Sequence, residues 1–369
     1  MNVSHHSLDK TFLVIIFTLV VFGLVMIASA GIVYSETRFG DQYFFFKRQL
    51  FSGALPGFLA LWFLQKFDYH KLRQLSVPFF LLSLVFLVLV FVPGIGTEAY
   101  GANRWIQLGP ISFQPSEMTK LALILYLAAW LASKGERRIR DVFEGFLPFL
   151  IVLSVASFLI IKQPDVGTVG VIVLIAIAIF FLSGAKIGHI ITMMFAGIFA
   201  LILLIKAAPY RLNRFLVFLN PELDQQGIGY QINQALLAIG SGGIFGLGLG
   251  HSRQKFNYLP EPVGDSIFAI IGEELGFVGA TIVIALFVVL ALRGLKIARN
   301  APDHFGRLVA VGIIAWIIFQ ALINVAAITS LIPLTGIPMP FISYGGTSLV
   351  FLLAAVGILL NISKQTVTK

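Results

Sequence analysis

The sequence predicts an all-α polytopic membrane protein with about ten transmembrane helices. Of its 369 residues, 58% are hydrophobic and 12% are charged, about half of the roughly 25% charged residues of a soluble domain. Runs of about 20 apolar residues, each long enough to cross ~30 Å of hydrocarbon, follow one another along the chain. No repeat of short period and no low-complexity linker divides it, so one membrane domain, residues 1–369, accounts for the sequence.

Hydropathy predicts where the spans lie and how the chain is oriented. The expected spans are residues 11–31, 50–66, 77–93, 115–133, 143–161, 166–183, 187–206, 266–291, 308–331 and 343–361. An even number of spans places both termini on the same side. With the N-terminus inside, short connections such as 134–142 and 292–307 are rich in Lys and Arg and lie in the cytoplasm, as the positive-inside rule expects. Both termini are therefore expected to be cytoplasmic.

Charge and composition exclude several functions. The formal net charge is +9, but in a membrane protein such an excess reflects basic cytoplasmic loops rather than nucleic-acid binding. The absence of Cys excludes disulfides and thiol chemistry, and the six His residues form no metal-binding pair. A divalent cation such as Mg²⁺ or Mn²⁺ could still assist catalysis, although the sequence contains no dedicated metal site.

A long polar segment, residues 207–265, is expected to form a large extracytoplasmic loop between the seventh and eighth spans. Connections of this length are usually functional. Asn220-Pro221 is typical of a helix start, and residues 230–239 suit a short helix that carries Gln231. The glycines of residues 240–250 are a weak signature for phosphate binding. They are more typical of a re-entrant segment that is buried in protein or lines a cavity.

Asp265 ends this segment and directly precedes the eighth span. The residue could simply cap the helix, where the helix dipole favours a carboxylate. Alternatively, it could serve as a general base, if partial burial raises its basicity. It is the leading candidate for a catalytic residue.

Two further polar motifs precede predicted helices. Pro115 begins a helix after a hairpin-like, Gly-broken connection, and Glu117 and Lys120 share one face of it. They could be a neutralising ion pair or functional groups at membrane depth. Asp165 follows Pro164 and could be a helix cap for Thr168, or a carboxylate facing the same outer cavity.

Several cations and one hydroxyl are also expected on the outer side. The cations could simply contact lipid headgroups, or together form a collar for an anionic ligand. Ser343, in the Pro- and Gly-broken entry to the last span, could line the same cavity. The cations taken as candidate ligand-binding residues are Arg104, Arg211, Arg214 and Lys255.

The motifs together resemble those of the SEDS (shape, elongation, division and sporulation) family, which includes FtsW, RodA and SpoVE. They occur in the family's order and spacing across nearly the whole chain, and resemble the FtsW branch most. The matching stretches are RWIQLGPISFQPSEMTKLAL, KQPDVGT, GYQINQALLAIGSGGIFGLGLG, YLPEPVGDSIFAIIGEELG and GIPMPFISYGGTSL.

The resemblance implies a peptidoglycan glycosyltransferase in the bacterial cytoplasmic (inner) membrane that polymerises lipid II at the outer face, in division or elongation. It places the family's essential aspartate on Asp265. One departure is that Val263-Gly264 and Ser266 stand where the family usually has His-Thr and Phe, so the packing around Asp265 is expected to differ. The other polar cavity residues of the family map onto Glu117, Lys120, Asp165 and Glu261.

The resemblance also implies a partner, a class B penicillin-binding protein that cross-links the new strand. A lipid II flippase would use the same polar cavity and broken helices, and remains the alternative. A non-enzymatic division scaffold would leave Asp265, Glu117 and Lys120 unexplained.

Overall fold

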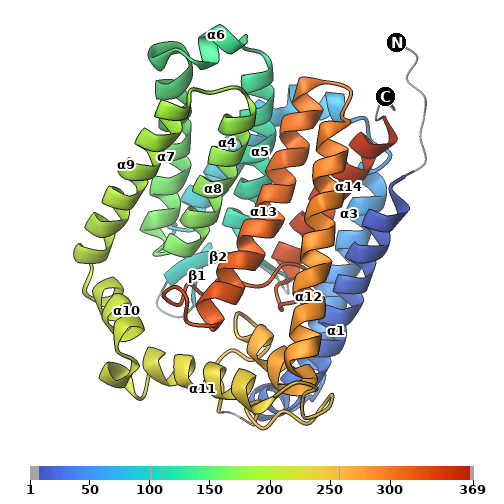
Figure 1. Ribbon diagram of the computed structural model, residues 1–369, viewed down its shortest axis with the longest axis vertical. Helices are drawn as coiled ribbons and strands as arrows, with labels where there is room; N and C mark the ends of the chain where they lie inside the picture. The colour runs from blue at the N-terminus through green and yellow to red at the C-terminus, as the bar shows by residue number, and fades with distance from the viewer. Residues whose placement is uncertain (1–7, 100–101, 110, 257, 366–369) are drawn as a thin grey trace.

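The protein is a helical bundle in the computed structural model, which describes residues 8–99, 102–109, 111–256 and 258–365 (Figure 1). The outermost residues of the predicted domain, 1–7 and 366–369, lie outside this description. The long helices and continuous helical runs are α1 (Lys10–Phe39), α2 (Phe44–Gln49) with η1 (Leu50–Ala54) and α3 (Leu55–Leu64), α4 (Tyr69–Leu89), α5 (Pro115–Ala132), η2 (Val142–Phe146) with α7 (Leu147–Lys162), α8 (Val166–Leu182), α9 (Ile187–Lys206), α12 (Ile267–Arg299), α13 (His304–Ile328) and α14 (Gly346–Lys364).

Each predicted span falls on one of these helices or helical runs. Among the described residues, seven helices are long and apolar enough to cross a membrane, and α8 is a shorter apolar helix. The predicted fold class, a polytopic helical membrane protein, is confirmed, while the number ten stays a prediction. The start of α1 and the end of α14 lie at the same end of the bundle (Figure 1), as an even number of crossings requires.

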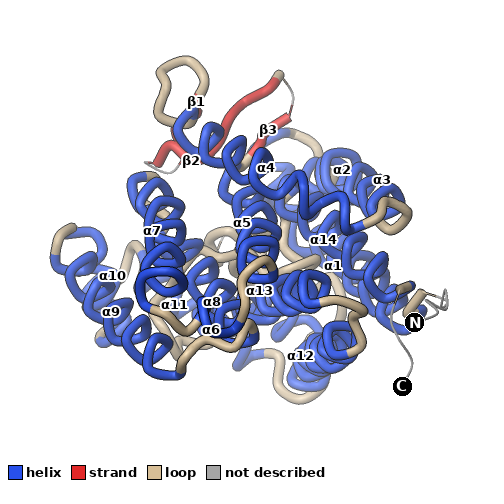
Figure 2. Tube along the Cα trace, turned by 90° about the horizontal axis from the view of Figure 1, so that it is seen from above, coloured by secondary structure: helices blue, strands red, loops and turns tan. Residues whose placement is uncertain are grey.

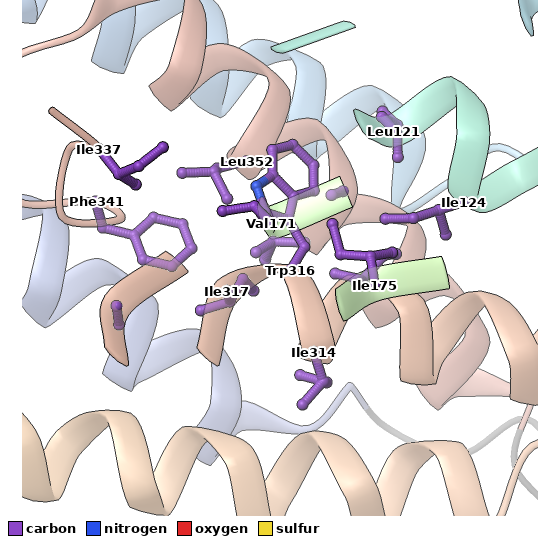
Figure 3. Packing of buried hydrophobic residues seen from close by; sticks show 14 of the residues in the cluster. Leu121, Ile124, Val171, Ile175, Ile314, Trp316, Ile317, Ile337, Phe341 and Leu352 are labelled. Atoms are coloured by element: carbon purple, nitrogen blue, oxygen red, sulfur yellow. The ribbon is translucent and has the colours of Figure 1, made fainter. Parts of the chain in front are cut away.

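The core of the bundle is built around α13 and α14. In their most apolar windows, 67% of the α13 residues and 83% of the α14 residues are buried, against 11% in α9. Figure 2 shows α13 near the middle of the bundle, with α9 and α12 at the periphery. Trp316 and Ile317 of α13 pack with Val171 of α8 and Leu352 of α14 in this core (Figure 3).

A small sheet is the exception to the predicted all-α fold. Strands β1 (Gly96–Ala99), β2 (Ala102–Leu108) and β3 (Ile111–Phe113) form an antiparallel sheet in the order β1-β2-β3. It lies at the edge of the bundle near α4 (Figure 2). The sequence predicted a hairpin here; in the strands, the extended backbone satisfies its N–H and C=O groups by pairing with itself.

The predicted polar segment folds into short helices at the end of the bundle opposite the start of α1 (Figure 1). They are α10 (Pro209–Leu219), the 3-10 turn η3 (Pro221–Asp224) and α11 (Ile228–Ser241), while α6 (Glu136–Ile139) lies at the other end. Asn220 accepts a hydrogen bond from the Glu222 backbone N–H at 3.2 Å, so the predicted helix start at Asn220-Pro221 is present.

The glycine-rich segment after α11 pairs with the backbone of α12 where that helix is broken. Gly276 has φ 67° and ψ −167° inside that helix, which frees backbone groups on both sides. The Glu273 and Glu274 carbonyls accept from the Leu247 and Gly248 N–H groups at 2.9 and 3.0 Å. A Cβ at Gly276 would lie 2.3 Å from the Gly246 nitrogen.

This pairing is the re-entrant packing that the sequence favoured for the glycines. It also changes the eighth span. The predicted span, residues 266–291, treats as continuous a helix that is broken at Gly276, because hydropathy is insensitive to a single backbone reversal.

Candidate active site

Asp265 lies in a tight turn immediately before α12. The Glu261 carbonyl accepts hydrogen bonds from the N–H groups of Gly264 and Ser266 at 3.0 and 3.4 Å, and Glu261 itself has a positive φ of 48°. Ser266 is the N-cap residue of α12. The Asp265 Oδ1 atom is buried and has no hydrogen-bond partner among the described residues. The Asp265 side chain therefore does not cap α12.

The surroundings of Asp265 make it a stronger base. Burial, followed by repulsion from the Glu261 carboxylate, raises the pKa of Asp265 from 3.8 to about 6. The Arg214 guanidinium of α10 and the backbone N–H groups of Asp265 and Ser266 act in the opposite direction. Near pH 7 the carboxyl is still mostly ionised and binds a proton more readily than an ordinary aspartate.

Glu117 and Lys120 form a buried ion pair at 2.7 Å on the first turns of α5. The Lys120 Nζ atom also donates to the Gln320 side-chain oxygen at 2.8 Å and lies 4.8 Å from the centre of the Trp316 ring. Glu117 Oε2 is buried and finds no hydrogen-bond partner within the part of the chain that the structure describes. The neutralising pair is confirmed, and one carboxylate oxygen remains unused.

Asp165 caps α8. Its Oδ1 accepts from the Thr168 N–H at 3.1 Å, and its Oδ2 accepts from the Thr168 hydroxyl at 2.8 Å. Arg104 of β2 donates to the carbonyls of Gln163 and Pro164 at 2.9 and 2.6 Å. Both side chains thus hold the turn between α7 and α8, and the capping alternative for Asp165 is confirmed.

Three further candidate residues lie on α10 and α11. Arg214 is exposed, and Arg211 is partly buried, donating to the Leu204 carbonyl at 3.2 Å. Gln231 donates to the Ser266 hydroxyl at 3.1 Å. Ser266, one of the three residues that depart from the family pattern, thereby ties α11 to the start of α12.

Lys255 takes part in a separate buried cluster around the break in α12. Its Nζ atom lies 3.3 Å from Glu274 Oε1, and Ser29 of α1 donates to both oxygens of Glu274 at 2.8 Å. Glu273 accepts from the Arg253 N–H at 2.8 Å and from the Ser252 hydroxyl at 2.5 Å. The two adjacent glutamates therefore hold residues 252–255 against α12 by structural hydrogen bonds.

Ser343 is also structural. It is buried, and its hydroxyl oxygen accepts the Met339 N–H at 2.7 Å. Within the ranges described above, no group of three or more His, Asp or Glu side chains is arranged to hold a metal ion.

Two amides of α13, Gln320 and Asn324, were missed by the sequence analysis. Asn324 donates to the backbone carbonyl of Asp265 at 2.8 Å, and Gln320 accepts from Lys120 as described above. A signal existed: they are polar side chains four residues apart in an otherwise apolar span, and such side chains face the protein interior.

A family model described as a cell cycle protein, covering FtsW, RodA and SpoVE, matches residues 9–368. The chain belongs to this family. Its relatives include stage V sporulation protein E of Bacillus subtilis (strain 168), 45% identical over 99% of this chain and 100% of that protein. A probable peptidoglycan glycosyltransferase FtsW of Trichlorobacter lovleyi is 43% identical over 96% of this chain and 93% of that protein.

Solved structures of family members share the fold. A chain of the structure "Structural coordination of polymerization and crosslinking by a peptidoglycan synthase complex" superposes with a TM-score of 0.80 at 27% identity, covering 98% of this chain and 99% of that one. The rod shape determining protein RodA of Thermus thermophilus gives a TM-score of 0.72 at 27% identity over the same shares. The resemblance inferred from the motifs is confirmed, and the chain is a multi-pass protein of the bacterial inner membrane.

Proposed function

We propose that this family member is a peptidoglycan glycosyltransferase that polymerises lipid II, with Asp265 as its general base. The observation that carries the proposal is the raised pKa of the partly exposed Asp265, whose buried Oδ1 atom has no partner among the described residues. The names of the relatives, probable peptidoglycan glycosyltransferase FtsW, support the same reaction class.

The reaction is a glycosyl transfer between two lipid-linked chains. The 4-hydroxyl of one sugar attacks the anomeric carbon of the other, and a new C–O bond forms there. The bond from that carbon to undecaprenyl pyrophosphate breaks, and its electron pair leaves with the pyrophosphate. Asp265 takes the hydroxyl proton as the bond forms, a role that contributes ~10²–10⁴ in rate.

The candidate substrate-binding residues differ in how free they are to touch a ligand. Arg214 is exposed near Asp265, and Arg211 and Gln231 are only partly buried. These side chains are available to offset charge on the leaving pyrophosphate or to hold the sugars. The remaining candidates make hydrogen bonds or ion pairs within the protein and have a structural role. They are Glu117, Lys120, Asp165, Arg104, Lys255, Glu261 and Ser343.

The proposal also includes the orientation of the chain in the membrane and a partner protein. Basic residues gather at the end where α1 begins, including Arg138, Arg140 and Lys186, so that end is cytoplasmic. Asp265 and α10–α11 then face outward, where lipid II is polymerised. A class B penicillin-binding protein is the proposed partner, since a structural relative comes from a complex that coordinates polymerization and crosslinking.

The test is glycan-strand formation from purified lipid II by the full chain in detergent, with the cognate class B partner. Wild type should form polymer, and Asp265→Asn, which keeps the side-chain shape, should form at least a hundredfold less. Asp41→Asn is the matched control, because Asp41 is a partly exposed aspartate paired with Lys47 between α1 and α2.

Two outcomes would overturn the proposal. Wild-type rates from a folded Asp265→Asn would remove the general base. A wild type that moves lipid II across vesicle membranes but never polymerises it would favour the transporter.

A further inference from the structure

Gln320 and Asn324 lie one turn apart on the buried face of α13, and both are at most 1% exposed. An amide has two donors and an acceptor, and burying such groups is unfavourable unless they are hydrogen-bonded. The contacts of these two side chains therefore indicate why α13 carries amides in an apolar stretch.

Asn324 binds the backbone on both sides of the site. Its Nδ2 atom donates to the carbonyl of Asp265 and to the carbonyl of Ile337, each at 2.8 Å. The two donors of one amide thus hold the start of α12 and the segment before α14 at a fixed separation. The Asn324 Oδ1 atom is buried and has no partner within the described ranges.

Gln320 makes the equivalent contacts one turn away. Its Nε2 atom donates to the Pro338 carbonyl at 3.0 Å. Its Oε1 atom accepts from Lys120 and from the Trp316 indole, both at 2.8 Å. The adjacent carbonyls of Ile337 and Pro338 are therefore held by adjacent amides of α13.

The segment held by these amides, residues 335–338, lies between Asp265 and the start of α8. At Gly336, φ is +69°, and a Cβ there would lie 3.8 Å from Asp265 Oδ2. On its other side, a Cβ on Gly167 of α8 would lie 2.9 Å from the Thr335 carbonyl oxygen. A shift of this segment would change the surroundings of the Asp265 carboxyl directly.

We propose that Asn324 is a positioning residue for the glycosyl transfer: it fixes the backbone at Asp265, while Gln320 fixes Lys120 from the same helix. The inference rests on the proposed function of Asp265. Asn324 acts through the Asp265 backbone, so its loss should lower kcat rather than weaken the binding of lipid II. Misplacing a reacting group by about 1 Å can cost ~10² in rate.

The pH dependence gives an independent readout. The charged groups that act on the Asp265 carboxyl are Glu261 in its own turn and Arg214 of α10. Asn324 is neutral, so it influences the titration through the position of the Asp265 turn rather than through a charge. If that hold is lost, more water should reach the partly exposed carboxyl, and the acid limb of the kcat profile should move to lower pH than in wild type.

The test compares Asn324→Leu with Asn361→Leu in the full chain with its class B partner. Asn361 is a matched control, because this buried amide of α14 also donates to a loop carbonyl, that of Gln65 at 3.0 Å, at the other end of the bundle. We expect Asn324→Leu to lose about tenfold or more in kcat, with KM for lipid II within about twofold and the acid limb shifted down. Asn361→Leu should lose thermal stability but keep kcat and the pH profile.

A wild-type kcat and pH profile in Asn324→Leu would overturn the inference, as would an equal kcat loss with an unshifted limb in both variants. If Asn324→Leu does not fold, Asn324→Asp keeps the volume and places a second carboxylate beside Asp265, so its acid limb should move up instead; an unmoved limb contradicts the inference. Failure of wild type to polymerise lipid II would instead overturn the proposed function, which separates the two.

Discussion

Asp165 and Asp265 have similar local sequences and different fates. Each follows a proline-containing stretch and stands before a helix, α8 or α12. Both carboxylate oxygens of Asp165 accept hydrogen bonds from Thr168. Asp265 keeps Oδ1 free of any partner among the described residues, while its backbone carbonyl is held by Asn324.

The difference lies in which part of the residue the protein holds. A capping carboxylate such as that of Asp165 stabilises its helix. At Asp265 the backbone is fixed, and the carboxyl keeps a buried oxygen without a hydrogen-bond partner among the described residues, which destabilises the fold and raises basicity. Helix-start aspartates can therefore be sorted into structural and chemical ones by their oxygen partners, and the following variants test that sorting.

The largest effect is expected at Asp265. Asp265→Ala removes the proposed base, and the initial rate of lipid II polymerisation should fall by ~10²–10⁴. The measurement is polymer length and rate by gel after a fixed time, with folding checked by gel filtration. A loss of less than tenfold would show that the free oxygen has no chemical role.

The buried ion pair extends the comparison to a third carboxylate. Lys120→Met leaves Glu117 charged and unpaired in the core, which should cost ~3–5 kcal/mol of unfolding free energy. The double variant Lys120→Met/Glu117→Gln should recover most of that loss, because no charge is stranded. Thermal unfolding in detergent measures both, and equal stability of the single and double variants would contradict this account.

The raised pKa of Asp265 should make the stability of the protein depend on pH. The pKa of Asp265 is raised from 3.8 to about 6 on folding, so the folded state binds the extra proton. Its unfavourable contribution is absent below pH ~4 and grows as the pH rises to about 6. Asp265→Asn should therefore melt higher than wild type at pH 8, and the two should converge near pH 4.

The smallest effect is expected from the capping aspartate. Asp165→Ala removes two hydrogen bonds to Thr168 and should cost ~0.5–2 kcal/mol. Asp165→Asn, which keeps an acceptor oxygen, should cost less. The comparison uses the same unfolding assay, and identical losses in both variants would argue against a cap.

The sequence predicted those parts of the fold that depend on composition over many residues. Each predicted span falls on a helix because runs of apolar residues must satisfy their backbone inside the bilayer. Features that depend on particular contacts were not predictable: the reversal at Gly276 and the pairing of β1, β2 and β3 into a sheet need contacts that hydropathy does not encode.

The candidate site shows the same division. The motifs identified Asp265 and the Glu117–Lys120 pair, because charged groups at membrane depth are rare. They could not indicate that Arg104 donates its hydrogen bonds to backbone carbonyls, or that Lys255 pairs with Glu274. Gln320 and Asn324 were not identified from the sequence because an uncharged amide hardly changes the hydropathy of a span.

The break in α12 also affects how the protein is made. An unbroken helix of 33 residues would be ~50 Å long at ~1.5 Å per residue, far more than the ~30 Å of hydrocarbon. The residues after Gly276 suffice to cross, while Glu273 and Glu274 before it pair with residues 247 and 248. The Asp265 turn is complete only once α13 has been made, because Asn324 of that helix holds the Asp265 carbonyl. Biogenesis therefore completes this end of the molecule late.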